Sequence, residues 1–484
     1  MQLIDLPADP LLAIFFDLDV EDVLSLKQSC RVLYTLGSLD CLWHKLVRTC
    51  NLPLDIPLGA DSSTLSGQEL QVIVIKALKL DHHWRKSDAR VKQAIPIIRS
   101  DTFYVENMHL LPGGKWLIST QHIPSSVGER HTDLTLWCLE DTTSPRSIKT
   151  IPIHGRTTSC RAYYQPVQCK FTIAIALEKD RSMWIEVHHI SLDNSAVVST
   201  QSESMMLQPV ASDGPFLVTL LDMRIYGDVL GATYYQDLGQ GRAHTVNVYL
   251  CNLVTGATTT FKAYTEEWSY NRPCFELFRD QFALASHDPS ETIVSFYDIP
   301  SSIISAHPNS DSSANPNRGH MSEDLLSARF RPSRCSSFHH RISSGSVEHG
   351  IPILNIMMFD WLSQEGTVDR FSPPIHETRF SDRFNIDSQA FDLYTQGITA
   401  VQLGATGRRA VWVDAGGDSW MLRKWSAPRY CRGEELPDGV SVLMPSSSGL
   451  PFNLKDISKV AFDEATCRLC ISVTTGGLYV CDFL

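Results

Sequence analysis

Residues 6–46 read LPADPLLAIFFDLDVEDVLSLKQSCRVLYTLGSLDCLWHKL, and apolar side chains recur through this stretch at helical spacing. Two successive stripes share the spacing i, i+3, i+4 and i+7, which is typical of one face of a helix. The first holds Leu11, Ile14, Phe15 and Leu18, and the second holds Val20, Val23, Leu24 and Lys27. Acidic residues stand near the start of the second stripe, as they commonly do in a first helical turn. The pattern predicts three short helices.

A module of this size has more apolar residues than it can bury alone. Units of about 40 residues generally need a staple or a partner to be stable. One interpretation is a small helical bundle that packs on the rest of the protein. The other is an interaction module, because a dense apolar cluster on a protein surface normally marks a binding site. We expect an interface of about 1,000 Å² or more in that case.

The stretch resembles the F-box. The first half of that pattern is present as Leu6, Pro7, Asp9, Leu11, Leu12, Ile14, Phe15 and Leu18. The second half is present as Asp22, Leu24, Cys30, Arg31, Leu42 and Trp43. The chain departs from the usual residues at Pro10, Ser29, Leu33 and Tyr34. Proline is tolerated in a first helical turn, where its missing N–H has no helical partner.

The resemblance implies a partner for this module. F-box modules dock on a Skp-type adaptor, which links them to a cullin scaffold and a ubiquitin-conjugating enzyme. By this resemblance, the residues that form or support the docking surface are Leu6, Pro7, Leu11, Ile14, Phe15, Leu24 and Trp43.

Composition bounds the remainder of the 484 residues. Apolar residues make up 43% and charged residues 20%, which is ordinary for a globular chain with a real core. The formal net charge of −12 disfavours nonspecific attraction to nucleic acid or to an anionic membrane. No signal-peptide pattern and no long apolar run is evident, so we expect an intracellular protein of the cytoplasm, the nucleus or both.

The 13 cysteines are odd in number and scattered, which argues against a disulfide framework. We interpret them as small buried side chains in a reducing compartment. Cys467 and Cys470 form a C-x-x-C pair, but a structural zinc site needs a second pair at matching spacing. We therefore expect no metal, no cofactor, and core strand positions for both cysteines.

Residues 51–100 read as a connector that contains one helix. Proline, glycine and a Ser-Ser-Thr run punctuate its first part. Ser66 and Glu69 then form a capping box before a helical apolar pattern made of Leu70, Ile73, Val74, Ala77 and Leu78. We expect this amphipathic helix to pack on the main body and hold the module in a fixed orientation.

From about residue 101 the period changes to that of strands. Residues 105–120 read VENMHLLPGGKWLIST, which predicts two strands joined by a tight turn. Similar units recur, and their landmarks, interpreted as outer-strand residues, are Trp137, Ile185, Tyr249, Phe296, Trp412 and Tyr479. A wider gap leaves room for one more unit around residues 353–359.

All-β repeats of this length favour a propeller of about seven blades, with six or eight also possible. The units resemble degenerate WD40 repeats, whose Trp-Asp ending is blurred here to Trp137-Cys138, Tyr297-Asp298 and Cys481-Asp482. A pair of β-sandwiches is the other architecture, although it does not explain a recurring unit. The whole arrangement is similar to a group of fungal F-box proteins.

Residues 301–350 interrupt the β pattern with many serines and several arginines. Such a composition buries too little surface to offset its ordering entropy, which predicts a mobile insertion between blades. One interpretation is a solvated loop. A second is a regulated loop, in which phosphate on Ser333, Ser336 or Ser337 would pair with nearby arginines.

No sequence signature of an enzyme was found. The chain lacks a G-x-S-x-G elbow, an H-E-x-x-H pair and a phosphate-binding loop. The predicted fold is therefore a multidomain α+β chain with a three-helix F-box at 1–50, a linker at 51–100 and an all-β propeller at 101–484. The predicted function is that of a non-catalytic, SCF-type substrate receptor that binds an unknown protein target. The alternatives are a scaffold that acts outside ubiquitination, and a propeller that is itself an enzyme or ligand sensor.

Overall fold

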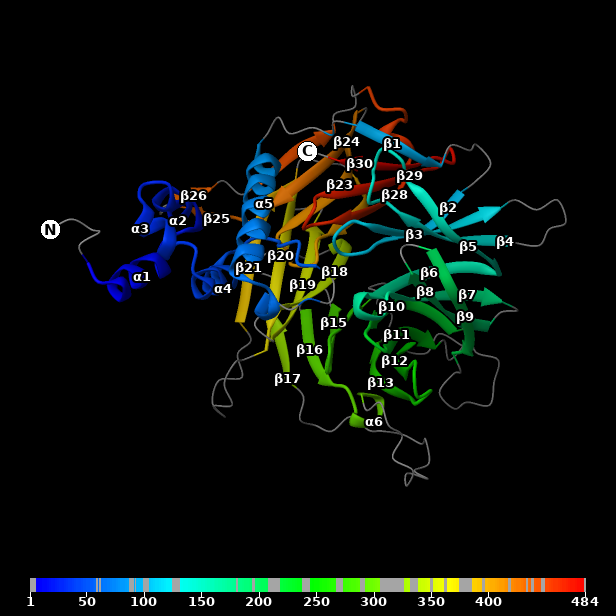
Figure 1. Cartoon of the computed structure of the whole chain (residues 1–484). Coiled ribbons are helices and arrows are strands. Elements are labelled where there is room, and N and C mark those ends of the chain that lie inside the picture. The colour runs from blue at the N-terminus through cyan, green and yellow to red at the C-terminus, as the bar shows by residue number, and fades with distance from the viewer. Residues whose placement is uncertain are drawn as a thin grey trace.

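The computed structural model describes residues 6–482 with gaps (Figure 1). The residues outside the description are 1–5, 58–59, 61, 87–90, 92, 99–103, 124–130, 180–181, 194–195, 208–217, 237–243, 267–272, 288–291, 305–325, 331–337, 349–350, 361–363, 374–384, 394–396, 417–418, 432–433, 437–438, 445–448 and 483–484.

Four short helices, rather than the three predicted, occupy the fully described residues 6–49. They are α1 (Ala8–Phe16), α2 (Val20–Lys27), α3 (Arg31–Leu36) and α4 (Asp40–Thr49). The additional boundary falls at Gly37, which ends α3 and packs against α2. A Cβ atom at Gly37 would lie 2.4 Å from Cγ of Lys27, so only glycine allows this approach.

The predicted connector helix is present as α5 (Gly67–Arg85). Its capping box forms as expected, with Ser66 and Glu69 each bonding the other's backbone N–H. The remaining short helical pieces in the described residues are η2 (Ser62–Thr64), η3 (Pro166–Gln168), α6 (Ser301–Ile304) and η4 (Leu454–Asp456). Among the described residues, no helix combines the length and the apolar character required to cross a bilayer.

The described strands form seven antiparallel four-stranded sheets, which are the blades of a propeller. Blade 1 holds β2 (Tyr104–Leu110), β3 (Trp116–Ile123), β4 (His131–Cys138) and β5 (Arg146–His154). Blade 2 holds β6 (Arg156–Gln165), β7 (Lys170–Lys179), β8 (Ser182–Asp193) and β9 (Ala196–Met206). Blade 3 holds β10 (Val218–Tyr226), β11 (Val229–Gln236), β12 (His244–Asn252) and β13 (Thr258–Glu266). Neighbouring first strands contact one another around the ring and line its channel.

Blades 4 to 7 continue the same plan. Blade 4 holds β14 (Cys274–Leu277), β15 (Gln281–His287), β16 (Thr292–Asp298) and β17 (Leu326–Phe330), and blade 5 holds β18 (Phe338–Glu348), β19 (Ile351–Asp360), β20 (Glu365–Ser372) and β21 (Asn385–Asp392). Blade 6 holds β22 (Ile398–Leu403), β23 (Arg409–Gly416), β24 (Ser419–Ser426) and β27 (Gly439–Met444). Blade 7 holds β28 (Ile457–Asp463), β29 (Arg468–Val473), β30 (Leu478–Asp482) and β1 (Gln93–Ile98). A separate hairpin pairs β25 (Arg429–Cys431) with β26 (Glu434–Leu436).

Strand β1 closes the ring. It pairs antiparallel with β30, so the outermost strand of blade 7 comes from the segment directly after α5. Closure of this kind joins the two ends of the propeller through backbone hydrogen bonds. The predicted propeller boundary at residue 101 is therefore too late, because β1 lies inside the predicted linker.

The apolar core of the propeller is divided among the contacts between blades. In the described residues, a separate buried cluster fills each of the seven junctions between neighbouring blades. Cys467 and Cys470 are both buried here, as predicted, but only Cys470 occupies a strand, β29, whereas Cys467 lies in the turn before it. These clusters explain why the strands read as nearly continuous apolar runs, since both faces of each blade are covered.

Two details of the predicted β region are corrected. Five of the six landmarks lie on the third strands of their blades rather than on outer strands, and the sixth, Trp412, lies on the second strand β23. The segment 301–350 is not simply an insertion, because β17 and β18 both lie within it and belong to blades 4 and 5. The three candidate phosphorylation sites, Ser333, Ser336 and Ser337, lie outside the described residues.

Candidate functional site

The four N-terminal helices share a core with α5 and not with the blades. The buried members of this cluster are Leu11, Phe15, Val20, Val23, Leu33, Leu42, Trp43, Leu46, Leu52, Leu70, Val74, Ala77 and Leu78. All of them come from residues 11–78, so no described blade residue belongs to this cluster. In Figure 1 the helices α1–α4 stand beside the propeller, with α5 between. The module therefore keeps a face that the propeller does not cover.

The seven predicted docking residues divide between this core and the surface. Leu11, Phe15 and Trp43 are buried, Leu6 and Leu24 are half-buried, and Pro7 and Ile14 are exposed. The side chain of Ile14 is 38% exposed. The buried three can support a docking face, whereas the exposed two can contact a partner directly.

Two apolar residues that sequence reasoning did not select add to the exposed surface. Val32 and Tyr34 of α3 are 49% and 58% exposed. Both follow Cys30 in the second half of the F-box pattern, where periodicity assigned no face. Large apolar side chains at such exposure on a small module are consistent with a contact surface.

Polar contacts fix the module to α5. The Lys27 ammonium donates to Oε1 of Gln71 at 2.7 Å and lies over the rings of Tyr34 and Trp43. Burial lowers the pKa of Lys27. The indole N–H of Trp43 donates to the carbonyl of Gly37 at 2.9 Å, so this buried ring leaves no polar atom unpaired.

The last turns of α5 dock on the propeller. The ring of Trp84 stacks on that of Phe462 of β28, with the two ring centroids 5.5 Å apart, and the indole N–H of Trp84 donates to the carbonyl of Trp425. The ammonium of Lys424 donates to the carbonyls of Trp84 and Lys86. These contacts tie the end of α5 to blades 6 and 7.

A buried ion pair reinforces this joint. Arg409 of β23 donates to Asp81 of α5 at 2.9 Å, and Arg85 donates to the other oxygen of the same carboxylate at 2.9 Å. Burial alone would raise the pKa of Asp81, but the two guanidinium groups outweigh it, and the pKa is lowered. The carboxylate is thus held ionised between helix and blade.

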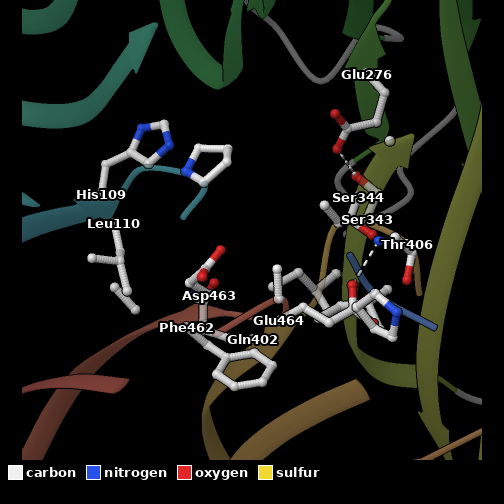
Figure 2. A pocket seen from close by; sticks show the side chains of 18 of the residues that line it. His109, Leu110, Glu276, Ser343, Ser344, Gln402, Thr406, Phe462, Asp463 and Glu464 are labelled. Atoms are coloured by element: carbon white, nitrogen blue, oxygen red, sulfur yellow. Dashed lines mark hydrogen bonds between the residues drawn. The ribbon is translucent and has the colours of Figure 1, made fainter. Parts of the chain in front are cut away.

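A second feature is a cavity of about 390 Å³ in the propeller channel (Figure 2). It lies where the first strands end, since Leu110, Leu403 and Asp463 are the last residues of β2, β22 and β28. Figure 2 shows His109 and Leu110 on one side, and Ser343, Ser344 and Thr406 on the opposite side. Pro53 and Leu54 of the connector also line it.

Four charged side chains from blades 2 to 4 form a network at this cavity. Arg224 of β10 forms two hydrogen bonds to Glu276 of β14, at 2.8 and 3.0 Å, and donates to Asp222 at 2.6 Å. Arg161 of β6 donates to the same Asp222 at 3.2 Å. The network places two guanidinium groups side by side, bridged by one carboxylate.

The other two carboxylates of the cavity have structural partners. Glu464 accepts from the backbone N–H groups of Thr406 and Arg408, at 2.7 and 2.8 Å. Asp463 accepts from the backbone of Thr466 and Gly113, and burial raises its pKa to about 6. Among the described residues, no group of three or more His, Cys, Asp and Glu side chains is arranged to hold a metal ion.

Sequence reasoning missed both the Asp81–Arg409 pair and the channel network. The available signal was a charged residue inside a strand-like run at Arg161, Arg224 and Glu276, which occupy the first strands of successive blades. That signal becomes readable only when the blades are aligned, because no local motif joins the three positions.

Three comparisons with known proteins bear on these features. The family model described as F-box-like matches residues 3–49. No protein of curated function matches the sequence.

Several solved structures are similar to the propeller part. An acylaminoacyl peptidase in complex with Z-Gly-Gly-Phe-chloromethyl ketone has 9% identity and a TM-score of 0.43, over 79% of this chain and 52% of that one. The β-propeller domain of the Trilobed protease from Pyrococcus furiosus has 10% identity and a TM-score of 0.39, over 80% and 95%. Penicillium chrysogenum alpha-L-arabinanase complexed with arabinobiose has 10% identity and a TM-score of 0.33, and the match covers 62% of this chain and 98% of that one.

The chain covers about half the length of the acylaminoacyl peptidases that it matches, at 52% and 50%. The family match falls on the four N-terminal helices, whose apolar surface the propeller leaves open. The chain thus joins an F-box-like domain at residues 3–49 to a seven-bladed β-propeller.

Proposed function

We propose that this chain is the target-recognition subunit of an SCF-type, cullin-RING ubiquitin ligase. Its F-box-like domain binds a Skp-type adaptor, and its propeller binds a protein target. The observation that carries the proposal is the separation of the two cores. The module completes its interior with α5, so the apolar side chains that remain exposed are available to a partner.

In this role the chain catalyses nothing itself. It raises the effective concentration of the captured target near the ubiquitin-loaded enzyme, which accelerates transfer by proximity. The buried joint between α5 and the blades supports this role, because a rigid link holds the target at one distance from the adaptor. The proposal places the protein in the cytoplasm or the nucleus, and assigns the blades a WD40-like use of their loops for protein contact.

The test is direct binding of the purified full chain to a Skp-type adaptor, followed by size-exclusion chromatography and calorimetry. Ile14→Asp places a charge on the exposed surface of α1 without entering the module core. We expect this variant to weaken adaptor binding by tenfold or more, since burial of an unpaired carboxylate at an interface costs several kcal/mol.

The chain offers a closely matched control. Ile386 on strand β21 is 37% exposed, against 38% for Ile14, so Ile386→Asp makes the same chemical change on the propeller. The control should bind the adaptor like the wild type. Equal binding by both variants would refute docking through α1, and no binding by the wild-type chain would refute the adaptor itself.

A scaffold role outside ubiquitination predicts a different composition of the assembled complex. A scaffold would bind the adaptor without a cullin in the assembled complex. A propeller enzyme gains no support from the channel carboxylates, because Glu276 and Glu464 are engaged by Arg224 and by backbone N–H groups.

A further inference from the structure

We propose that the channel cavity binds a small organic anion. Its carboxylate or phosphate group is held by Arg161 and His109, and its apolar body lies against Leu110, Leu403 and Phe462. This site is separate from the adaptor-binding surface and does not depend on the proposed ligase role.

Arg161 is the cation with donors to spare. A guanidinium group has five N–H donors. Arg224 directs its three nitrogens to Glu276, Asp222 and a backbone carbonyl. Within the described part of the chain, Arg161 makes two hydrogen bonds, one to the carbonyl of Cys160 and one to Asp222, and its side chain is 31% exposed in the channel. An anion that enters the cavity can therefore accept from Arg161 without breaking an existing pair.

His109 supplies a second, neutral donor. The backbone N–H of Ala162 donates to its Nδ1 at 3.0 Å, which leaves the proton of the neutral imidazole on Nε2. Burial, together with the nearby Arg161 and Arg224 guanidinium groups, lowers the pKa of His109 to about 3. The ring is thus neutral at physiological pH, mainly because it is buried, and the Arg161 and Arg224 guanidinium groups lie close enough to it to lower its pKa further.

The cavity has the size and lining of a small-molecule site. Its volume of about 390 Å³ lies in the range of roughly 300–1,000 Å³ that is common for ligand pockets. Apolar residues contribute much of the wall, including Met108, Leu110, Ile342, Leu403 and Phe462. The wall also carries the carboxylates of Glu276, Asp463 and Glu464, which accept from Arg224 or from backbone N–H groups, so an anionic headgroup on a compact apolar body would pair with Arg161.

The position of the cavity gives its occupant a structural consequence. Pro53 and Leu54 belong to the connector that leads from the F-box-like domain to α5, and both line the cavity. The same connector is held to the propeller by a hydrogen bond from Arg408 to Asn51 at 3.0 Å. A bound anion would contact the connector and the blades together, and would restrain residues 52–57.

Binding is tested on the purified full chain by saturation-transfer NMR and titration with three probes. The probes are 3-phenylpropionate, phenyl phosphate and 2-phenylethylamine, which share an aromatic body and differ in charge. We expect saturable binding of at least one acid and none of the amine. The tighter of the two acids identifies the headgroup as carboxylate or phosphate. Hydrogen exchange at residues 52–57 should slow when the acid is bound.

Three variants assign the binding to this cavity. Arg161→Gln should weaken acid binding about tenfold or more, since a hydrogen bond to a charged group contributes about 1.5–3 kcal/mol. Asp222 keeps its bond to Arg224 in this variant, so we expect the fold to be retained, which the thermal unfolding midpoint checks. Arg161→Lys restores the charge and should recover most of the affinity. Arg156→Gln removes an exposed arginine of the same strand and should bind like the wild type.

Each remaining outcome overturns the proposal. Failure of both acids to bind the wild-type chain excludes an anion site of this kind. Equal binding by Arg161→Gln places the probe elsewhere, and binding of the amine in preference to the acids reverses the assigned charge. Adaptor binding is measured separately with Ile14→Asp, so loss of one proposal leaves the other standing.

Discussion

At the scale of single residues, arginine has three different uses in this chain. Arg409 is almost fully buried and neutralised by Asp81, and Arg224 is satisfied by Glu276 and Asp222. Arg161 alone of these three retains both exposure and unused donors. Identical residue types in similar strands thus differ in function because their partners differ, and composition gives no indication of this.

The pKa of His109 leads to a prediction about pH. The folded chain holds this imidazole neutral down to about pH 3, whereas the unfolded chain protonates it near pH 6.5. The unfolded state therefore binds more protons in that window, and stability falls as the pH is lowered from about 6.5 toward 3. His109→Gln should lose stability less steeply, by up to about 1.4 kcal/mol per pH unit.

Thermal unfolding measured at half-unit pH steps checks this slope. His82→Gln, a change on the exposed side of α5, is the matched control and should follow the wild-type curve. Parallel curves for the wild type and His109→Gln would show that this histidine is not held neutral by the fold.

At the scale of elements, α5 belongs to two cores. Its first half, with Leu70, Val74 and Ala77, completes the F-box-like domain, and its end, with Leu80 and Trp84, enters the contact between blades 6 and 7. The sequence predicted an amphipathic helix that packs on the main body. The helix exists as predicted, but its apolar stripe is shared between the two domains, which a single period cannot reveal.

Breaking the buried pair on α5 should destabilise this joint. Asp81→Asn leaves the buried Arg409 without its carboxylate, and loss of one partner of such a pair costs about 3–5 kcal/mol. Urea unfolding followed by tryptophan fluorescence measures the loss. Lys76→Gln, on the same helix, removes an exposed pair with Asp55 of the connector and should cost less than about 1 kcal/mol. Similar losses for the two variants would contradict the assigned role of Asp81.

Local sequence patterns predicted the helices and many of the strands, but they did not predict which distant strands pair with each other. The capping box at Ser66 and the turn between β2 and β3 depend on neighbours in sequence, and both are confirmed. Strand β1 was not predicted because its partner, β30, lies at the far end of the sequence, so no local pattern joins the two (Gln93 pairs with Asp482). Strand β18 was not predicted because Ser343 and Ser344 line the channel cavity, so the sequence of this strand looks like that of a polar loop.

The candidate docking site shows the same limit. Helical spacing grouped Leu11, Ile14 and Phe15 on one stripe, yet only Ile14 is exposed. An apolar stripe alone does not distinguish side chains that pack inside the module from side chains that stay exposed on its surface. Burial in the free chain distinguishes these two classes, and it depends on how α1 packs on α3 and α4.

At the scale of the whole molecule, the described contacts that join the propeller to the helical domain lie at the end of α5 and along the connector at residues 51–54. Helix α5 leads into β1, and β1 closes the ring against the last strand of the chain, so the joint and the closure share blade 7. The charged network and the cavity lie inside this ring. The arrangement separates an apolar surface on the helices from a polar channel in the blades.

The central claim is that the helical domain connects this propeller to a cullin complex through an adaptor. Quantitative affinity purification of the tagged full-length chain from its native cells tests it, with the adaptor and the cullin measured together. We expect both to accompany the wild-type chain and Ile386→Asp in fixed proportion, and both to be lost with Ile14→Asp. An adaptor without a cullin, or a wild-type chain that carries neither, would contradict the account.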